Sequence, residues 1–265
     1  MNKIPERQFN RALVRTPGRS VISGLTTANL GQPDYSLILK QHQAYINALE
    51  SCGVKPMVLS PLESYPDSTF VEDTAILTQN GAIITQPGAV SRRDEIQFIQ
   101  PILKTWFKTV ERIRAPGRLD AGDVVEAGNR FFIGISKRTN AEGARQCTNI
   151  LKRFGYTAKT LNVHSGIHLK SGVGYLAKNT LVLSADYADE PAFKSYKRLV
   201  LPKGESYAAN CVYLNGTVLI PSGFPGVKSV LESAGFSTRS LDMTEFRKLD
   251  GGLSCLSLRF TVPEK

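Results

Sequence analysis

The sequence has few cysteines and no long apolar run. Its four cysteines, Cys52, Cys147, Cys211 and Cys255, are far apart and include no CxxC pair. A disulfide framework is therefore not expected, and a thiol-reducing compartment is favoured. No apolar stretch approaches the ~20 residues that a membrane-spanning helix needs. The first ten residues, MNKIPERQFN, lack the apolar core of a secretory signal, so we expect a cytoplasmic protein that does not span a membrane.

Basic residues outnumber acidic ones, but not in a pattern typical of nucleic-acid binding. The 33 basic and 23 acidic residues give a net charge of +10, which is spread from end to end. The densest basic stretch, 194–203 (KSYKRLVLPK), also fits a solvated helix edge, and no helix-turn-helix, zinc-finger or RNP motif accompanies it. With 265 residues, 42% of them hydrophobic, the chain can bury a core of its own. We expect one domain over 1–265 and no nucleic-acid partner.

Several segments are predicted to form β-hairpins that recur at a similar interval. Each has two apolar or β-branched runs around a polar or Gly/Asn turn. These segments are 75–85 (AILTQNGAIIT), 124–134 (VVEAGNRFFIG), 173–183 (VGYLAKNTLVL) and 212–220 (VYLNGTVLI). Their first residues are 49, 49 and 39 positions apart. A fifth hairpin forms if the chain ends are joined, because 255–260 (CLSLRF) could pair with 12–15 (ALVR).

Helical patterns separate several of these hairpins. Residues 34–52 carry apolar side chains on one helical face and stand between a proline and a glycine. Similar patterns predict helices over 92–107, 140–154 and 228–234, whereas 188–199 is ambiguous. Five hairpin-and-helix units, with the chain ends sharing one, suggest a closed ring of small α/β modules. A generic α+β domain whose hairpins merely recur at a common spacing is the alternative that the spacing leaves open.

Side chains with catalytic potential precede the hairpins. Carboxylates cluster at 66–73 (PDSTFVED) and at 119–123 (LDAGD), His168 precedes the third hairpin, and Cys255 begins the fifth. In a ring of modules these entries would face a common centre, as nucleophilic catalysis on a cationic substrate requires. Taken singly, each residue also fits a turn former, a strand-edge charge or a buried thiol. Only their joint placement favours a site.

Several other kinds of site are not supported by the sequence. His164 and His168 are four residues apart, but Gly166 between them argues against a helix, and no neighbouring glutamate matches a zincin. The chain has no GxxxxGK[ST] phosphate loop and no GxSxG nucleophile elbow. The pair Gly172 and Gly174 lacks the third glycine of a dinucleotide fingerprint. No metal or cofactor is expected.

Seven segments, in order over nearly the whole chain, resemble the dimethylarginine dimethylaminohydrolases of the guanidino-group-modifying (pentein) superfamily. They are PDSTFVEDTA (66–75), PGAVSRRDE (87–95), LDAGDV (119–124), SKRTNAEGARQ (136–146), HLKSG (168–172), ESYAANC (205–211) and KLDGGLSCLSLRF (248–260). The resemblance implies an α/β fold, a five-bladed α/β propeller of ββαβ-type modules with pseudo-five-fold symmetry, whose N- and C-terminal segments share one blade. It also implies a small-molecule substrate. Nω,Nω-dimethylarginine, and monomethylarginine with it, would be hydrolysed to citrulline and dimethylamine or methylamine through a covalent S-alkylthiouronium, without a cofactor.

The resemblance further implies a role for each matched residue. Cys255 would be the nucleophile, His168 the general acid/base and Asp120 the carboxylate that orients the histidine. The substrate-binding residues would be Leu25, Asp67, Glu72, Asp73, Arg92, Arg138, Leu249 and Asp250. Of these, the acids of 67–73 would hold the guanidinium and the α-amine, and the two arginines would bind the substrate carboxylate. Leu25 would cover the pocket, and the backbone carbonyl of Leu249 would accept the α-amine.

Two other functions stay open at this point. Arginine deiminases resemble the chain at the cysteine and the histidine, but they are longer and carry an acid two residues after the histidine. Lys170 stands there, which favours a methylated substrate with fewer N–H donors. A non-catalytic methylarginine-binding protein would have lost the cysteine, the histidine or the orienting acid, and none is lost. The sequence also leaves open a homodimer, the motion of a lid around Leu25, and the preference between mono- and dimethylated arginine.

Overall fold

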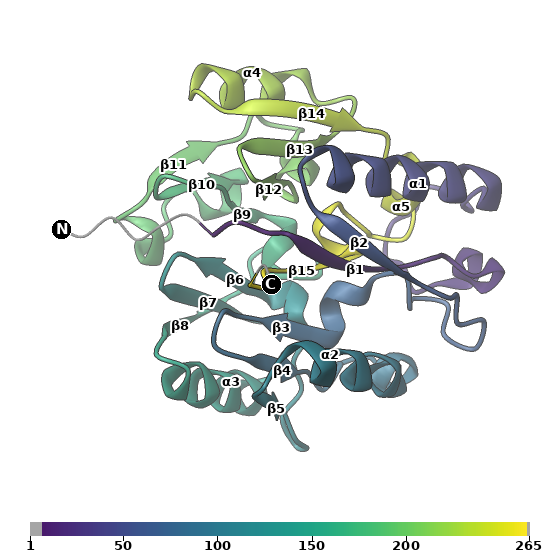
Figure 1. The fold of residues 1–265 in the computed structure, drawn as a ribbon. Helices are drawn as coiled ribbons and strands as arrows, with labels where there is room; N and C mark the ends of the chain where they lie inside the picture. The colour runs from purple at the N-terminus through teal and green to yellow at the C-terminus, as the bar shows by residue number, and fades with distance from the viewer. Residues whose placement is uncertain (1–6, 264–265) are drawn as a thin grey trace.

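The computed structural model describes residues 7–263 and forms five three-stranded sheets that are built alike (Figure 1). Residues 1–6, part of the segment expected not to be a signal, lie outside the described residues. The strands are β1 (Arg11–Arg15), β2 (Lys55–Leu59), β3 (Ala75–Leu77), β4 (Ala82–Ile84), β5 (Val110–Arg112), β6 (Val124–Ala127), β7 (Arg130–Ile135), β8 (Thr157–Asn162), β9 (Val173–Tyr175), β10 (Thr180–Leu183), β11 (Lys197–Val200), β12 (Val212–Leu214), β13 (Thr217–Pro221), β14 (Ser237–Leu241) and β15 (Leu258–Phe260).

Each sheet combines an antiparallel hairpin with a third, parallel strand. The orders are β3-β4-β5, β6-β7-β8, β9-β10-β11, β12-β13-β14 and β15-β1-β2. The pairs β3/β4, β6/β7, β9/β10 and β12/β13 confirm the four predicted hairpins. The tight turn of the last pair uses Asn215 and Gly216, both at positive φ, as a two-residue hairpin loop favours.

The fifth sheet joins the two ends of the chain. Arg11 pairs with Phe260 and Leu13 with Leu258, so β15 lies antiparallel to β1. The predicted pairing of the C-terminal run with the N-terminal strand is therefore confirmed. Cys255, however, lies ahead of this strand in the 3₁₀ turn η9 (Ser254–Leu256). β1 is parallel to β2, and a parallel pair needs a crossover, which is the first helix of the chain.

The helices are α1 (Tyr35–Ser51), α2 (Gln100–Trp106), α3 (Ala141–Arg153), α4 (Pro225–Ser233) and α5 (Thr244–Arg247). Side chains cap the starts of α1 and α3: Asp34 accepts a hydrogen bond from the N–H of Leu37 at 3.0 Å, and Asn140 accepts one from Gly143 at 2.8 Å. Glycines at positive φ, Gly53 and Gly155, follow their ends. Both helices match their predicted ranges.

The other helical predictions differ from the structure. Residues 92–107 form the 3₁₀ segment η3 (Val90–Phe98) followed by α2, because Pro101 in the first turn of α2 lacks the N–H that a continuous helix would use. The helix predicted over 228–234 begins earlier, at Pro225, a residue well suited to a first helical position. The ambiguous stretch 188–199 contains the 3₁₀ turn η7 (Pro191–Phe193) and most of β11, so this unit crosses over without an α-helix.

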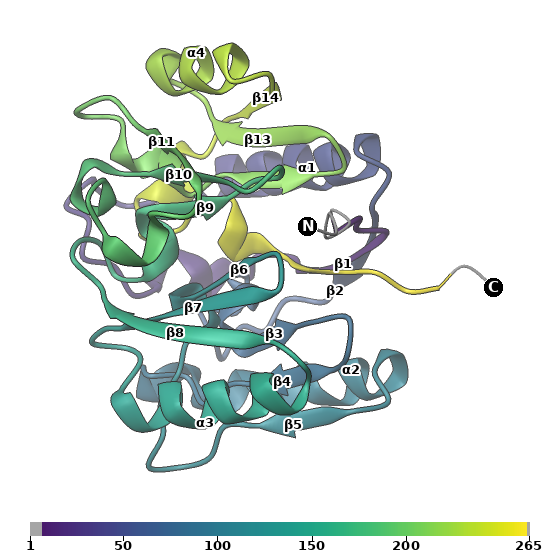
Figure 2. The same ribbon diagram turned by 90° about the vertical axis from the view of Figure 1, so that its left-hand side faces the viewer.

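The crossover helices lie on the outside of the molecule and the hairpins lie toward its middle (Figures 1 and 2). Apolar clusters fill the space between sheets and helices; one of them joins Ile38, Tyr45 and Leu49 of α1 to Val14 of β1 and Leu219 of β13. The first strands of the sheets, β3, β6, β9, β12 and β15, line a central cavity of about 1430 Å³. β15 contacts β3, and β9 contacts both β6 and β12.

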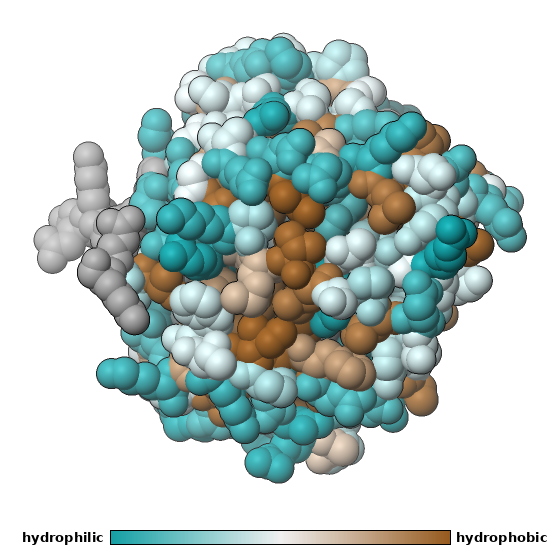
Figure 3. All heavy atoms as spheres, turned by 45° about the vertical axis from the view of Figure 1, so that its right-hand side comes forward, coloured by the Kyte–Doolittle hydropathy of each residue, from teal (hydrophilic) through white to brown (hydrophobic). Residues whose placement is uncertain are grey.

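One face of the molecule carries an apolar region. Figure 3 shows a band of apolar side chains across the middle of one face. The exposed large hydrophobic residues include Met57 and Val58 of β2, which is an edge strand of its sheet. Within residues 7–263 no helix has the length and apolar character to cross a membrane.

Candidate active site

Short 3₁₀ turns at the start of the first strands lie against one another. They are η2 (Val71–Thr74), η4 (Ala121–Asp123), η5 (Leu169–Ser171), η8 (Ser206–Ala209) and η9. η2 contacts both η4 and η9, and η5 contacts both η4 and η8. Each turn directly precedes the first strand of a different sheet, so the predicted meeting of the hairpin entries is confirmed.

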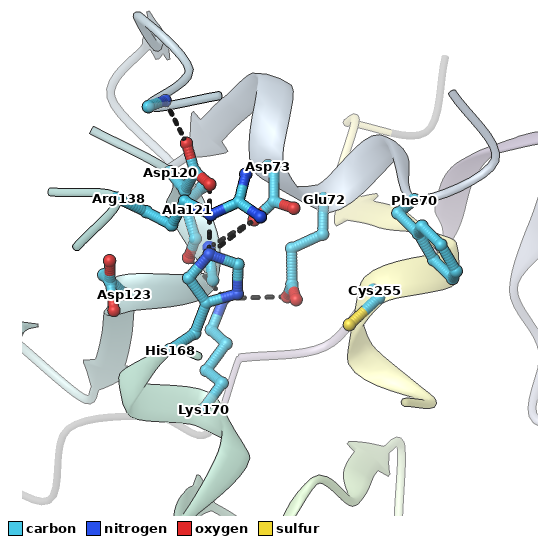
Figure 4. A network of polar contacts seen from close by, with 12 residues as sticks. Phe70, Glu72, Asp73, Asp120, Ala121, Asp123, Arg138, His168, Lys170 and Cys255 are labelled. Atoms are coloured by element: carbon cyan, nitrogen blue, oxygen red, sulfur yellow. Dashed lines mark hydrogen bonds and ion pairs between the residues drawn. The ribbon is translucent and has the colours of Figure 1, made fainter. Parts of the chain in front are cut away.

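His168, immediately before η5, is a buried base held by carboxylates (Figure 4). Its Nε2 lies 3.0 Å from Oδ2 of Asp120 and 4.0 Å from Oδ1 of Asp73. Burial lowers the pKa of His168, but the negative charges of Asp73, Asp120 and Asp123 together outweigh burial and raise it to about 9. The imidazole is therefore protonated at neutral pH and is ready to donate a proton.

Asp120 stays ionised beside this histidine. Burial raises the pKa of Asp120, but the hydrogen bond and charge of His168, the charge of Arg92 and the N–H of Gly88 together lower it. That N–H donates to Oδ1 of Asp120 at 2.7 Å, which leaves Oδ2 for the imidazole. The predicted pairing of His168 with Asp120 is thus present in the structure.

Asp73 connects the histidine to a buried arginine. Its Oδ2 accepts a hydrogen bond from Nη1 of Arg92 at 2.6 Å, and its Oδ1 accepts the N–H of Gly122 at 2.9 Å. Gly122 lies so close to the ring that an added Cβ would be 2.6 Å from Nδ1 of His168. Only glycine allows this approach of backbone to imidazole.

The same three groups have a spacing that a metal ion could use. Asp73, Asp120 and His168 place ligand atoms within 4.8 Å of one another. The two carboxylates, however, already accept hydrogen bonds from Arg92 and from backbone N–H groups. A protonated histidine therefore fits the arrangement better than a metal ion does.

A small cavity of about 30 Å³ brings the predicted site residues together. Its lining includes Cys255, His168 and every predicted substrate-binding residue except Glu72, namely Leu25, Asp67, Asp73, Arg92, Arg138, Leu249 and Asp250. Phe70, Ile167 and Gly251 complete the lining, and the sequence analysis did not single them out.

Cys255 carries a protonated thiol in this environment. Burial, followed by the negative charges of Glu72 and Asp73, raises the pKa of the thiol to about 12. The N–H of Gly252, which lies 3.4 Å from Sγ, and the charge of Lys170 oppose that shift. A cation bound beside the sulfur would lower the pKa of the thiol and favour the thiolate.

The two predicted arginines are not equivalent. Arg92 donates from Nε and Nη2 to Glu95 at 3.0 and 2.9 Å, from Nη2 to the carbonyl of Phe70 at 2.9 Å, and from Nη1 to Asp73. A guanidinium has five N–H donors, so about one is left for a ligand. Arg92 therefore cannot bind the substrate carboxylate through two N–H groups, although the resemblance implied that both arginines bind it. Within residues 7–263 the side chain of Arg138 makes no hydrogen bond or ion pair. Its guanidinium is therefore available to bind a ligand.

Two acids hold the segment that covers the cavity. Oδ1 of Asp67 accepts the N–H of Leu25 at 2.9 Å. The carboxylate of Asp250, a residue at positive φ, accepts the N–H of Thr27 and its hydroxyl, the latter at 2.9 Å. Leu25 itself is 42% exposed. Burial raises the pKa of Asp67 in spite of nearby arginines. The carbonyl of Leu249 accepts no hydrogen bond from the described residues, so it is free for a donor.

Glu72 is turned away from the small cavity. Its Oε1 accepts a hydrogen bond from Nζ of Lys170 at 2.7 Å, and its Oε2 accepts one from the hydroxyl of Ser254 at 2.6 Å. Both Glu72 and Lys170 line the central cavity. The predicted contact of Glu72 with a substrate is not available in this arrangement. Lys170, at the position where deiminases carry an acid, does not line the small cavity either.

Asp123 is a buried residue beside the site to which the sequence analysis gave no role. Its Oδ1 accepts the N–H of Leu169 at 2.9 Å, and its Oδ2 accepts the hydroxyls of Ser136 and Thr139 at 2.6 Å each. Because Leu169 follows His168 in the chain, this hydrogen bond to Asp123 holds the backbone next to the histidine.

Comparison with known proteins agrees with this geometry. The family model described as arginine deiminase matches residues 28–186. The chain is 44% identical over 253 residues to an N(G),N(G)-dimethylarginine dimethylaminohydrolase of Pseudomonas aeruginosa, covering 95% of this chain and 100% of that protein.

Solved structures of such enzymes are also similar. A cysteine-to-serine variant of the Pseudomonas aeruginosa enzyme, complexed with citrulline, superimposes with a TM-score of 0.94 at 43% identity, over 96% of this chain and 100% of that one. A histidine-to-glycine variant of a dimethylarginine dimethylaminohydrolase, as an adduct with S-methyl-L-thiocitrulline, gives a TM-score of 0.93 at 43% identity, with the same coverage. This chain therefore belongs to the dimethylarginine dimethylaminohydrolases, within the wider arginine deiminase family.

Proposed function

We propose that the protein hydrolyses Nω,Nω-dimethyl-L-arginine, and Nω-monomethyl-L-arginine with it, to L-citrulline and dimethylamine or methylamine. The observation that carries the proposal is the cavity in which Cys255 and a protonated His168 face buried acids. A buried carboxylate stabilises a guanidinium through charge-assisted hydrogen bonds. The relative that was solved with citrulline is 43% identical to this chain, which supports the same product.

Binding is divided between the two ends of the substrate. Asp73 lies beside His168, where the guanidinium must be for the reaction, and its charge would hold that cation. Arg138 has a free guanidinium for the substrate carboxylate, with one remaining N–H of Arg92 beside it. Asp67 and the free carbonyl of Leu249 would accept the α-amine. Glu72 is left out of direct binding because its carboxylate is engaged by Lys170 and Ser254.

The first half-reaction begins with the thiol. The bound cation lowers the pKa of Cys255 and its proton passes to water, which leaves a thiolate beside the guanidinium carbon. Sulfur attacks that carbon to give a tetrahedral adduct. His168, protonated and held by Asp120, then donates its proton to the dimethylated nitrogen, because an amine cannot leave as an anion. Dimethylamine departs, and an S-alkylthiouronium remains on Cys255.

The second half-reaction uses the histidine in the opposite direction. Neutral His168 removes a proton from water as the oxygen adds to the thiouronium carbon. The new tetrahedral adduct collapses, the carbon–sulfur bond breaks, and citrulline leaves while the cysteine is regenerated. Asp120 holds the ring through both steps, and Asp123 holds the backbone behind it. The residues Cys255, His168 and Asp120 complete this sequence without a cofactor.

One assay tests the proposal against its nearest rival. Citrulline formation is measured with asymmetric dimethylarginine, monomethylarginine and arginine side by side, together with the amine released. We expect turnover of the methylated substrates. Turnover of arginine alone, with ammonia as product, would establish the deiminase activity for which the matching family model is named. Binding of methylarginine without any turnover would establish the binding-only protein.

The cavity of about 30 Å³ is too small for an amino acid with a long side chain, since about that much space holds one or two water molecules. We therefore propose that the segment around Leu25, held by Asp67 and Asp250, opens to admit substrate. Loss of the Asp250 contact, as in Asp250→Ala, should speed the exchange of bound citrulline measured by stopped-flow mixing.

We propose that the five sheets close into an α/β propeller with pseudo-five-fold symmetry and that the chain is one domain. The common build of the sheets, the contacts between neighbouring first strands and their shared central cavity support this. Removal of β15 would then open the ring, so a chain ending before Leu258 should fail to fold.

All four cysteines are free, which supports a reducing compartment, the cytoplasm. A homodimer that covers the apolar band of Figure 3 is tested by sedimentation.

A further inference from the structure

The wall between the small cavity and the central cavity is about one residue thick. Along three turns, one residue faces the small cavity and a near neighbour in the chain faces the central one. Asp73, Cys255 and His168 line the small cavity, and Glu72, Ser254 and Lys170 line the central one. Figure 4 shows Glu72 and Cys255 coming from different turns, with the carboxylate of Glu72 bonded to Lys170.

The residues on the central side form a continuous polar network. Glu72 accepts the ammonium of Lys170 at 2.7 Å and the hydroxyl of Ser254 at 2.6 Å. Lys170 also donates to the carbonyl of Ala121 at 3.0 Å, on the turn that follows Asp120. The network therefore ties η2, η4, η5 and η9 together from behind.

The turn that carries Cys255 is held most tightly by this network. Asn210 accepts the N–H of Ser254 at 2.9 Å and donates to its hydroxyl at 3.2 Å. Arg259 donates to the carbonyl of Ser254 at 3.2 Å and lies 3.4 Å from Oε1 of Glu72. Ser254 is thus fixed at its N–H, its hydroxyl and its carbonyl, and the adjacent Cys255 has little freedom to move.

Charges of both signs on this wall act on the sulfur. Asp73 and His168 face Cys255 from the small cavity, and Glu72 and Lys170 reach it from behind. Asp67, Arg92, Arg138 and Asp250 also line the small cavity, and Arg259 on β15 and Tyr207 on η8 lie on the other side of the turn. Glu72 and Lys170 have opposite signs and are bonded to each other, so their effects on a thiolate oppose. After burial, Glu72 has the largest effect on the thiol, and Lys170 offsets only part of it.

We propose that Glu72 and Lys170 are positioning residues that act on Cys255 through the wall: Glu72 holds the nucleophile turn through Ser254, and the charge of Glu72, partly offset by that of Lys170, decides how readily the thiol ionises. This assigns Glu72 a place behind the nucleophile and not on the substrate. The inference rests on the proposed function only for the identity of the nucleophile. It needs no substrate to be tested.

The test is the rate at which iodoacetamide alkylates Cys255 at pH 8, followed by mass spectrometry of the peptide that contains it. Below the pKa of a thiol, its alkylation rate follows the thiolate fraction. One charge beside a group shifts its pKa by about one unit or more, so Glu72→Gln should speed alkylation about tenfold. Lys170→Met should slow it less, by about threefold, because Lys170 has the smaller effect on the thiol. The double variant Glu72→Gln/Lys170→Met should lie between Glu72→Gln and wild type, about threefold faster than wild type.

A matched control for Lys170→Met comes from the same cavity. Lys178→Met removes one positive charge from the lining of the central cavity, in the turn between β9 and β10. It should alkylate at the wild-type rate. Glu72→Gln should leave the KM for dimethylarginine unchanged. If Glu72 bound the substrate directly, its removal would raise KM.

Opposite effects of the two single variants, with the double variant between Glu72→Gln and wild type, support the inference. Changes in the same direction, or rates equal to that of the control, overturn it. If Glu72→Gln fails to fold by near-ultraviolet circular dichroism, Lys170→Met and the double variant still decide, because the first must be slower than wild type and the second must be faster. A wild-type protein that turns over no methylarginine while the alkylation rates diverge refutes the proposed function alone.

Discussion

Glu72 and Asp73 are neighbours on one 3₁₀ turn, yet they belong to different parts of the molecule. Asp73 bonds Arg92 and lies near His168 in a cavity of about 30 Å³, whereas Glu72 bonds Lys170 and Ser254 beside a cavity of about 1430 Å³. On so tight a turn, consecutive side chains point to different sides. One face of the turn therefore lines the small cavity, and the other bonds the turns that surround it.

Asp120 and Asp123 repeat the same division on the next turn. Asp120 contacts the imidazole of His168, and Asp123 contacts the backbone just after it. In both pairs, one carboxylate touches a reacting group and its partner touches the scaffold. Substitutions on the two sides should therefore differ in kind: the first should change chemical rates, and the second should change position, acidity or stability.

The largest effect is expected at the reacting groups themselves. Cys255→Ser and His168→Gly should each lower kcat by about 10³-fold or more, because a serine hydroxyl is a far weaker nucleophile and a single histidine serves two proton transfers. Citrulline release under saturating dimethylarginine measures both.

The two variants should nevertheless separate with an analogue whose leaving group needs no proton. S-methyl-L-thiocitrulline or a 4-halopyridine should modify Cys255 in His168→Gly, but should leave Cys255→Ser unmodified. Peptide mass spectrometry locates the adduct. An adduct on Cys52, Cys147 or Cys211 with Cys255 untouched would refute the assignment of the nucleophile.

Asp73→Asn should come next, with a loss of about 10²-fold in kcat/KM, since hydrogen bonds to charged groups contribute about 1.5–3 kcal/mol each. Arg92 keeps Glu95 as a charged partner, so the fold should survive. Glu126→Gln, a carboxylate of the central cavity, serves as the control and should keep its activity. A kcat/KM near wild type in Asp73→Asn would show that Asp73, like Glu72, only holds the surrounding structure.

The raised pKa of His168 makes a prediction for stability. Its pKa is about 9 in the folded protein and about 6.5 in an unfolded chain, so the protonated ring stabilises the fold fully below pH 6.5. This contribution, about 3 kcal/mol, is lost as the pH rises through 9. Urea unfolding at pH 6 and pH 9.5 measures it, with His168→Gln as the reference. Equal pH dependence in the two proteins would show that the histidine is not protonated.

The hairpins and the pairing of the chain ends could be predicted from the sequence because hairpins are local, whereas the parallel third strand of each sheet could not. Alternating apolar runs around Asn-Gly or polar turns need only neighbouring residues, and the shared sheet of the chain ends followed from counting them. The segment 92–107 was assigned wrongly because helical periodicity continued through Pro101 while the backbone did not.

The site was harder to predict in its details. Cys255 and His168 line one cavity and Asp120 contacts the histidine, while their roles stay predictions. The resemblance could not tell which face of a turn each acid takes. Glu72 and Arg92 illustrate this. Lys170, which bonds Glu72, comes from a segment far away in the sequence, so packing between segments decides that pair. Glu95, which bonds Arg92, lies in the same 3₁₀ segment, so side-chain rotamers decide that pair. Asp123 was passed over because its task is a bond to backbone, for which no side-chain pattern exists.

The smallest effect concerns the two arginines and sharpens the same comparison. Arg138 has no partner among the described residues, so Arg138→Lys should raise KM about tenfold, with kcat and the thermal midpoint unchanged, because the two-pronged contact with the substrate carboxylate is worth about 1.4 kcal/mol more than a point charge. Arg92→Lys should instead lower the thermal midpoint, since it breaks buried bonds to Asp73, Glu95 and Phe70 that a lysine cannot replace together. Initial rates and differential scanning fluorimetry on both variants make the test. A KM that Arg138→Lys leaves unchanged would remove Arg138 from the site, and an unchanged midpoint in Arg92→Lys would return Arg92 to the substrate side.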